Sequence, residues 1–424
     1  MQRSYDRRAL LRMLGLGTGA VALSACAPSG GGGSTPSGDP EAKDFTFASW
    51  SLADDASKIG PQHLVDAYQK ANGGTITGLP IAFPDYLNQL LLQIRGGQFT
   101  GVAQLDIAWL SAVSALGKLR DLGPLAQGVD YTDTALSTGQ LDGKQYGLPW
   151  TTAAIGMIVN QDILAKVGAD ALPETVSDFE ALLVEIAATG VLPYAASTKV
   201  AQLKDMLIWM QTFGCSLIDG DKITIGDDAS VDALTWYKSL YDRKLIAADV
   251  ERTDARTLFS QGRTAMYDDA LVGKDVVAKQ SPDKELINKI APHPRPVVAA
   301  GDTPQAQQWG HILVVVEGEG AASAAKFAKW ATSDPTAAAG YFKDVSLPPT
   351  TDTGLAAPEV AGDQFTTQFN ERVTATATPN PFWRFPQYAQ MENAVSEHVQ
   401  AALIGKSSPA DAMRDAKKAV EGLV

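Results

Sequence analysis

Cysteine, histidine and positive charge are all scarce in this sequence of 424 residues. Two cysteines cannot build a disulfide scaffold, and four scattered histidines argue against a zinc enzyme. A net charge of −13 argues against binding of nucleic acid or adsorption to anionic lipid, because both need a basic surface. The Gly-x-Ser-x-Gly and His-Glu-x-x-His motifs of two hydrolase classes are also missing. We therefore expect no catalytic residues, no metal and no cofactor.

Long apolar runs are equally scarce, since none after residue 25 approaches the roughly 20 residues that span a bilayer. The N-terminus combines four arginines with an uncharged, mostly apolar run from Met13 to Ala25, which is typical of an export signal. Arg7 and Arg8 resemble the pair of a twin-arginine signal. Asp6 stands where serine or threonine is usual, so the general secretion route is the alternative.

The end of this signal resembles a bacterial lipobox, with the sequence Leu-Ser-Ala-Cys at residues 23–26. The resemblance implies that residues 1–25 are removed and that the thiol of Cys26 is lipidated. A plain signal peptide cut after Ala25 is the alternative. Residues 26–43 are rich in Gly, Ser and Pro, which predicts a flexible tether. We expect a lipid-anchored protein on the extracytoplasmic side, facing a periplasm or the cell surface.

The body alternates short apolar runs of strand length with longer amphipathic segments. Strands are expected at 45–48, 75–77, 105–109, 156–159 and 312–316, and helices at 61–71 and 86–94. The C-terminal third is expected to be helical, with a last helix that Ser408 caps. This alternation predicts the α/β class, with a mostly parallel sheet covered by helices on both faces.

Segments along the whole body resemble motifs of one protein family. They are the sequences at 146–150, 156–164, 172–179, 236–242, 258–266 and 403–412. In this order they resemble bacterial extracellular solute-binding proteins of the sugar-binding type, the class of maltose-binding protein, over roughly residues 45–424. Two segments depart from the family pattern. Leu105 replaces the usual proline before Asp106, and residues 307–310 carry Gln-Gln-Trp-Gly where glycines are common.

The resemblance implies a periplasmic-binding-protein type II fold, in which three crossovers join two α/β lobes and the ligand lies between the lobes. Lobe 1 would take residues 44–150 and about 295–342, and lobe 2 about 155–291 and 349–424. The resemblance further implies a monomer that serves an ABC importer by delivering a small solute to a membrane permease.

A neutral sugar offers apolar ring faces and hydroxyl groups, which aromatic and polar side chains bind. Tryptophans and carboxylates lie where the expected strands end, which is where open α/β sheets bind ligands. The candidate ligand-binding residues are Trp50, Asp54, Asp55, Asp85, Tyr86, Trp109, Trp150, Asp268, Asp269, Trp309, His311, Trp383 and Arg384. For each residue, core packing, helix capping or plain solvent exposure is the alternative interpretation.

Three other functions remain open at this point. The carboxylates could bind a polyamine, and a polyol or a glycerol-phosphate is a further alternative, although a phosphate would need several basic residues and Arg384 is nearly the only candidate. Two carboxylates in a cleft could also serve a surface glycosidase. An adhesive or structural lipoprotein would bind no solute.

Overall fold

The computed structural model describes residues 39–55 and 57–424. The predicted signal at 1–25 and the lipidation site at Cys26 lie outside the described residues. The end of the predicted tether is bonded to the body, since the carbonyls of Asp39 and Pro40 accept hydrogen bonds from the backbone N–H groups of Gly320 and Ala322. The tether predicted at 26–43 is therefore too long at its C-terminal end.

The described residues contain one mixed sheet of nine strands. The strands are β1 (Phe45–Ser49), β2 (Ile76–Pro80), β3 (Gly101–Asp106), β6 (Gly147–Asn160), β7 (Leu192–Ala195), β10 (Thr264–Asp269), β11 (Ile290–His293), β12 (Ala306–Val316) and β13 (Ala377–Thr378). Their order is β2-β1-β3-β12-β6-β10-β7, with β11 beside β6 and β13 beside β12. The prediction of a mostly parallel sheet is wrong, because the long strands β6 and β12 pair antiparallel with each other and with β3, β10 and β11.

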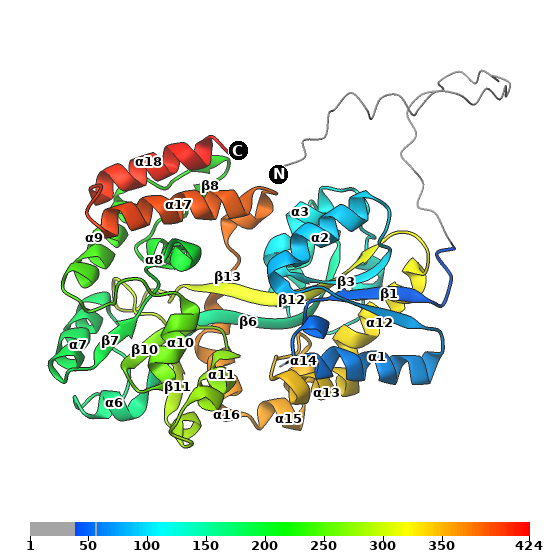
Figure 1. The fold of residues 1–424 in the computed structure, drawn as a ribbon, viewed down its shortest axis with the longest axis horizontal. Helices are drawn as coiled ribbons and strands as arrows, with labels where there is room; N and C mark the ends of the chain where they lie inside the picture. Colours follow the sequence, from blue (N-terminus) through cyan, green and yellow to red (C-terminus); the bar gives the residue numbers. More distant parts are fainter. Residues whose placement is uncertain (1–38, 56) are drawn as a thin grey trace, which may run out of the picture. The chain divides into compact units, whose positions relative to one another are not determined.

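The strands β6 and β12 run through both halves of the sheet (Figure 1). We call the half around β1, β2 and β3 lobe 1, and the half around β7, β10 and β11 lobe 2. Pro149 of β6 pairs with Ile312 beside lobe 1, whereas Ile158 pairs with β10 in lobe 2. β11 and Val297 still pair with elements of lobe 2, so the chain has not yet left lobe 2 at residue 297. The structure therefore favours β12 as the second crossover between the lobes. This crossover comes later in the chain than the predicted change of lobe between residues 291 and 295.

Helices cover both faces of the sheet, as the sequence predicts (Figure 1). Lobe 1 carries α1 (Ile59–Asn72), α2 (Phe83–Arg95), α3 (Leu110–Ser114), α4 (Gly123–Ala126), α5 (Asp133–Ser137), α12 (Ala321–Ser333) and α13 (Pro335–Val345). Lobe 2 carries α6 (Gln161–Ala165), α7 (Val176–Ala188), α8 (Met206–Thr212), α9 (Asp228–Asp242), α10 (Arg252–Ser260), α11 (Gly273–Gln280), α17 (Tyr388–Leu403) and α18 (Pro409–Glu421). The return to lobe 2 after α13 runs through α14 (Asp352–Leu355), α15 (Pro358–Ala361) and α16 (Gln364–Arg372).

Short elements complete the fold. They are the 3₁₀ turns η1 (Ser51–Ala53), η2 (Ile107–Trp109), η3 (Val200–Asp205), η4 (Leu286–Asn288), η5 (Thr374–Thr376) and η6 (Pro381–Arg384), and the hairpins β4 (Gln140–Leu141) with β5 (Lys144–Gln145) and β8 (Ile218–Asp219) with β9 (Lys222–Ile223). The strand predicted at 105–109 ends at Asp106, because this carboxylate accepts a hydrogen bond from the Ala108 N–H and turns the chain into η2. The Ser408 cap of α18 is confirmed. Over residues 39–55 and 57–424, no helix combines the length and apolarity needed to cross a bilayer.

Candidate functional site

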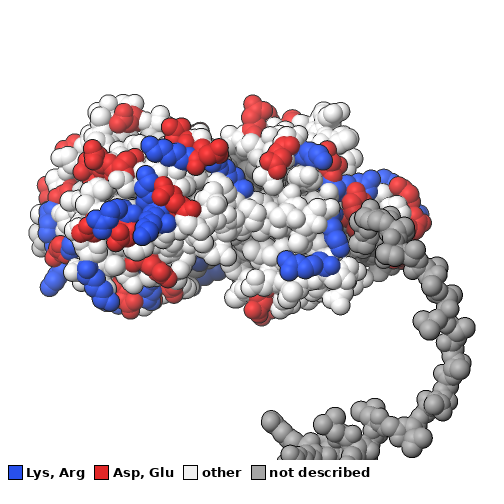
Figure 2. Space-filling view, turned by 90° about the horizontal axis from the view of Figure 1, so that it is seen from above, with Lys and Arg blue, Asp and Glu red and all other residues white. Residues whose placement is uncertain are grey.

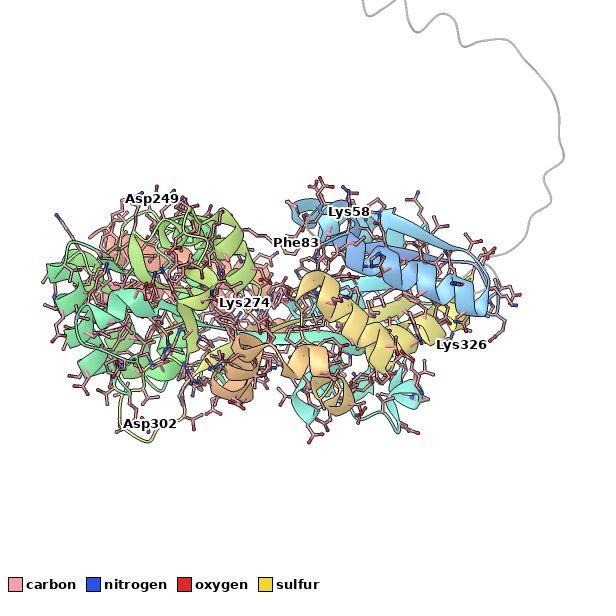
Figure 3. The ribbon with its side chains drawn as sticks, turned by 90° about the horizontal axis from the view of Figure 1, so that it is seen from below. Lys58, Phe83, Asp249, Lys274, Asp302 and Lys326 are labelled. Carbon is pink, nitrogen blue, oxygen red and sulfur yellow. The ribbon has the colours of Figure 1, made fainter. Side chains whose placement is uncertain are left out.

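Three aromatic rings meet at the ends of β1 and β3 in lobe 1. Trp50 follows β1, Trp109 ends η2 after β3, and Phe83 opens α2. The ring centroids lie 5.2 Å apart for Trp50 and Trp109, 5.6 Å for Trp50 and Phe83, and 5.4 Å for Phe83 and Trp109. The two tryptophans are each 9% exposed, but Phe83 is 52% exposed. Figure 3 shows Phe83 on the side of lobe 1 that is turned toward lobe 2. An exposed ring on a packed aromatic base is a suitable surface for a ligand.

A buried histidine extends this aromatic group along β12. The ring of His311 lies 4.9 Å from Trp50 and 4.9 Å from Trp309. Ser49 Oγ donates to Gln104 Oε1, so the amide of Gln104 turns its Nε2 toward His311 Nδ1 at 3.2 Å. Burial lowers the pKa of His311 to about 3. The imidazole is therefore neutral and carries its proton on Nε2.

Lobe 2 presents charged and aromatic groups of its own. Glu392 on α17 is buried, and its Oε1 accepts hydrogen bonds from Asn380 Nδ2 at 2.9 Å and from Trp383 Nε1 at 3.0 Å. The other carboxylate oxygen lies 3.8 Å from Lys204 Nζ on η3. Tyr388 also belongs to α17, and its hydroxyl lies near the side chain of Trp109 in lobe 1. Near this contact, Ser111 Oγ of lobe 1 donates to the Phe385 carbonyl of lobe 2 at 3.2 Å.

Asp106 of lobe 1 interacts electrostatically with the charged groups of lobe 2. Burial raises its pKa to about 6, while Lys204 lowers it and Glu392 raises it from across the lobes. We call the combined set the interlobe site. It consists of Trp50, Phe83, Asp106, Trp109, Trp309 and His311, with Lys204, Trp383, Tyr388 and Glu392 from lobe 2.

A pocket with a volume of about 360 Å³ adjoins the interlobe site. It is lined from lobe 1 by Ile107, Leu110 and Ser111, and from lobe 2 by Trp383 and Arg384. Figure 2 shows charged side chains gathered over lobe 2, whereas the surface between the two lobes is largely uncharged. This arrangement can hold a polar, largely uncharged molecule against aromatic surface.

Several predicted site residues lie in the interlobe site. Trp50, Trp109, Trp309 and His311 come together on lobe 1 and β12, and Trp383 lies on lobe 2. Arg384 lines the adjoining pocket, and its guanidinium stacks 4.8 Å from the ring of Phe385.

Two predicted aromatic residues lie beneath the surface. Tyr86 is fully buried, and its hydroxyl donates to the Ala48 carbonyl at 2.9 Å, so it supports Trp50 from below. Trp150 is 3% exposed and packs 4.4 Å from Tyr341 and 6.2 Å from Phe47 in the core of lobe 1. The structure therefore does not bring Trp150 into the interlobe site.

The five carboxylates predicted to bind ligand lie outside the interlobe site. Asp268 is buried and bonded to Arg295 and Tyr194, and Asp269 is buried in a bidentate pair with Arg256 at 2.6 and 2.9 Å. The remaining three are exposed: Asp55 pairs with Lys58 at 2.6 Å, Asp54 accepts from Ser57 Oγ at 3.0 Å, and Asp85 lies in the first turn of α2. None of these five carboxylates belongs to the interlobe site as defined above.

The sequence analysis missed the functional candidates Phe83, Lys204, Tyr388 and Glu392, and treated Asp106 only as part of a family motif. Phe83 directly precedes Pro84 and Asp85. Because Asp85 was a candidate ligand-binding residue, the start of this helix was already singled out by the sequence. The lobe 2 residues come from helical segments whose apolar spacing predicts core packing and gives no sign of a charged group facing another lobe.

The raised pKa of Asp106 makes a testable difference to stability. Between about pH 4 and pH 6 the folded protein keeps a proton on Asp106 that the unfolded chain has lost, so this contribution to stability falls as pH rises. Asparagine keeps the acceptor for the Ala108 N–H but carries no charge. We expect Asp106→Asn to gain about 2 kcal/mol relative to wild type between pH 4 and pH 7, measured by urea unfolding at both pH values. A difference between the two proteins that does not change with pH contradicts the assignment.

Metal chemistry receives no support from the described part of the chain, where no group of three or more His, Cys, Asp or Glu side chains is placed to hold an ion.

Comparison with known proteins gives one family match and many structural ones. The family model described as bacterial extracellular solute-binding protein matches residues 63–367. Proteins of Brucella abortus (strain 2308) and Brucella suis biovar 1 (strain 1330), each described as a binding protein, are 24% identical over 245 residues. This match covers 55% of the present chain and 60% of those relatives, so the chain spans less than two thirds of their length.

Solved structures match over nearly the whole body. The GacH receptor of Streptomyces glaucescens, solved without ligand and with acarbose, is 21% identical with a TM-score of 0.79. That match covers 90% of this chain and 98% of the receptor. The sugar-binding protein MalE of Xanthomonas citri has a TM-score of 0.78 at 18% identity, with 90% and 97% of the chains covered. Maltose-bound MalE3 of T. maritima has a TM-score of 0.76 at 20% identity, with 90% and 100% covered. These similarities confirm the two-lobed fold.

Proposed function

This chain belongs to the family of bacterial extracellular solute-binding proteins, and from that premise we propose that it captures a carbohydrate between its lobes for an ABC importer. The observation that carries the proposal is the interlobe site, in which aromatic rings from lobe 1 face hydrogen-bonding groups from lobe 2. The exposed ring of Phe83 suits the apolar face of a sugar, and Asp106, Lys204 and Glu392 suit its hydroxyl groups. The maltose and acarbose complexes of structurally similar proteins support a ligand of this class.

Capture requires no bond to be broken. A ligand held by residues of both lobes favours the closed arrangement, because only there does it contact both sides at once. Changing the open-to-closed ratio from 99:1 to 1:99 needs about 5.5 kcal/mol of differential affinity, which several buried contacts can supply.

The location of the protein at the membrane and its partner there are also part of the proposal. The N-terminal sequence supports export and a lipid anchor on Cys26, and the family supports delivery of the solute to a membrane permease. The described chain enters the body at Asp39, which is bonded to the start of α12 in lobe 1. A tethered protein would therefore be held through lobe 1, which leaves lobe 2 as the lobe that moves away from the anchor.

The structure weakens two alternatives. A glycosidase built on Asp268 and Asp269 would need these carboxylates in a cleft, but arginines pair with both of them in the interior of lobe 2. A glycerol-phosphate would bring its anionic group to a site that already holds two carboxylates and one lysine. A polyol and a polyamine remain alternatives to be tested beside sugars.

A thermal-shift screen of the purified protein tests the proposal. Mono-, di- and oligosaccharides, polyols and polyamines are compared, and a ligand at 100 times its Kd stabilises the folded state by about 2.7 kcal/mol. We expect a raised melting temperature with at least one carbohydrate. A response to polyols or polyamines only, or to none of the panel, contradicts the proposed function.

We expect Phe83→Ala to weaken binding of that carbohydrate by about 10- to 100-fold, because stacking surface at the mouth of the site is lost. Thermal stability changes little, since the ring is 52% exposed. Leu92→Ala is the matched control, because Leu92 is a 65% exposed apolar residue on the same helix. Isothermal titration calorimetry measures both variants. Equal affinities for Phe83→Ala and Leu92→Ala show that the ligand does not contact Phe83.

A further inference from the structure

Three polar side chains form a line of hydrogen bonds across neighbouring strands of lobe 1. Ser49 ends β1, Gln104 lies in β3 and His311 lies in β12, and these strands are adjacent in the sheet (Figure 1). Ser49 Oγ donates to Gln104 Oε1 at 2.5 Å, and Gln104 Nε2 lies 3.2 Å from His311 Nδ1. Ser49 and Gln104 are fully buried, so bulk water does not compete for these bonds. Nδ1 of His311 is therefore held as an acceptor.

The second ring nitrogen of His311 has no such partner. Nε2 and Nδ1 point away from each other across the ring, so Nε2 faces away from the buried amide of Gln104. Within residues 39–55 and 57–424, no hydrogen bond reaches Nε2. Nε2 is also not one of the fully buried side-chain atoms that lack a partner in this part of the chain, so we infer that its N–H meets accessible space. A residue that is only 5% exposed thus turns one unpaired donor outward.

Aromatic rings border this donor. The ring centroids of Trp50 and Trp309 each lie 4.9 Å from that of His311, and both indoles meet the imidazole edge to face, at 89° and 73°. These contacts hold the imidazole in place and supply apolar surface beside its N–H. A sugar ring that lies against such a surface carries oxygen atoms around its edge, within reach of a neighbouring donor.

We propose that His311 determines specificity by donating a hydrogen bond from Nε2–H to an oxygen of the bound carbohydrate, and that Ser49 and Gln104 are positioning residues that keep the proton on Nε2. This inference rests on the proposed carbohydrate function and adds a requirement to it. When a ligand covers the site, water no longer accepts from Nε2–H, so a ligand without an acceptor at this point leaves a buried donor unpaired. A site of this kind rejects molecules that lack the matching group.

The position of the proton is tested first, in the protein without ligand. Long-range proton–nitrogen NMR distinguishes a protonated from an unprotonated ring nitrogen, and the sequence has four histidines, so the signals lost in His311→Phe assign this residue. We expect Nε2–H in the wild type. Gln104→Glu offers an acceptor to Nδ1 and should move the proton to that nitrogen at about pH 9, where the carboxylate is ionised. Gln104→Met is the matched control, because it removes the amide without supplying an acceptor, and it should not place the proton on Nδ1.

Calorimetry then separates the donor from the aromatic ring. The probe is the sugar with the largest thermal shift among glucose, galactose, maltose, trehalose, cellobiose, raffinose and maltotetraose. His311→Phe keeps a ring beside both tryptophans but has no donor, so binding should weaken about 10-fold. His311→Gln loses the ring but keeps an amide N–H, so it should bind at least about 3-fold more tightly than His311→Phe.

The two substitutions of Gln104 complete the binding test. At about pH 9, Gln104→Glu should weaken binding about 10-fold, because Nε2 then lacks the proton, whereas Gln104→Met should stay within about 3-fold of wild type. Urea unfolding checks that each variant is folded. Spermidine should not bind the wild type, because its protonated nitrogens are donors only and Nε2–H needs an acceptor.

The contrary outcomes separate the two proposals. A wild type with its proton on Nδ1, or a Gln104→Glu variant that keeps it on Nε2, overturns the role of Ser49 and Gln104. Unchanged affinity in His311→Phe, or weaker binding by His311→Gln than by His311→Phe, overturns the donor role of His311. Each of these results leaves the carbohydrate function intact. A shift with spermidine and with none of the sugars contradicts this inference and the proposed function alike.

Discussion

Replacing Arg295 by methionine lowers the free energy of unfolding by about 3–5 kcal/mol, because it leaves a buried carboxylate without its cation. Arg295 is 2% exposed, and its guanidinium bonds Asp268 and the Ile155 carbonyl, the latter at 2.9 Å. The same group lies 5.7 Å from the ring of Trp209. Methionine replaces the packing of the arginine stem and removes the charge. Urea unfolding at neutral pH measures the loss.

Two further variants separate the charge from the general effect of losing an arginine. Arg414 also contacts an aspartate, Asp411, but the pair lies on the surface of α18, so Arg414→Met should leave stability unchanged within error. Adding Asp268→Asn to Arg295→Met removes the uncompensated charge and should recover part of the loss. A single Arg295→Met variant as stable as Arg414→Met would show that the buried pair contributes nothing.

This ion pair also shows where sequence reasoning stops. Asp268 and Asp269 are the last two residues of β10, a strand that the sequence analysis did not predict. Neighbouring residues of a strand point to opposite faces, so two adjacent carboxylates cannot both face one ligand from β10. Their partners Arg295 and Arg256 come from elsewhere in the chain. Nothing in the local pattern names these partners, because tertiary packing selects them.

The fold was more predictable than the site. Apolar periodicity predicted helices at 61–71 and 86–94, and the structure confirms them as α1 and α2 with slightly longer bounds. The lengths of β6 and β12 were missed, because Gly147, Pro149 and Gly156 interrupt the first pattern and glutamines open the second. These two strands make the sheet mixed. The two-lobed fold itself came from the family resemblance, which the solved structures confirm.

Several residues of the interlobe site could be predicted from the sequence because they lie at the ends of strands. Trp50 and Trp109 follow strands, where the general rule for α/β sheets applies. Phe83, Lys204 and Glu392 lie at a helix start, in a 3₁₀ turn and within a long helix. Side chains on such elements reach a common site only through the packing of one lobe against the other, and that packing has no local sequence pattern.

The sequence analysis listed Trp150 as a ligand-binding candidate because it lies at the first presumed crossover between the lobes, and a bulge explains its actual position. The pairing of β12 with β6 shifts between His311, opposite Thr151, and Ile312, opposite Pro149, which leaves Trp150 as the extra residue. A bulged residue leaves the regular alternation of faces. The indole then enters the core of lobe 1, where its Nε1 has no hydrogen-bond partner among the described residues.

Trp150→Ala should therefore lower the free energy of unfolding by about 3–5 kcal/mol, the usual cost of a large cavity in a core. Trp150→Phe should cost much less, because it keeps a ring between Tyr341 and Phe47 and loses only an unpaired N–H. Ligand affinity, measured at a temperature where each variant is folded, should stay within about 3-fold of wild type, since Trp150 lies outside the interlobe site. Full stability of Trp150→Ala with a large loss of affinity would instead return Trp150 to the ligand, as the sequence predicted.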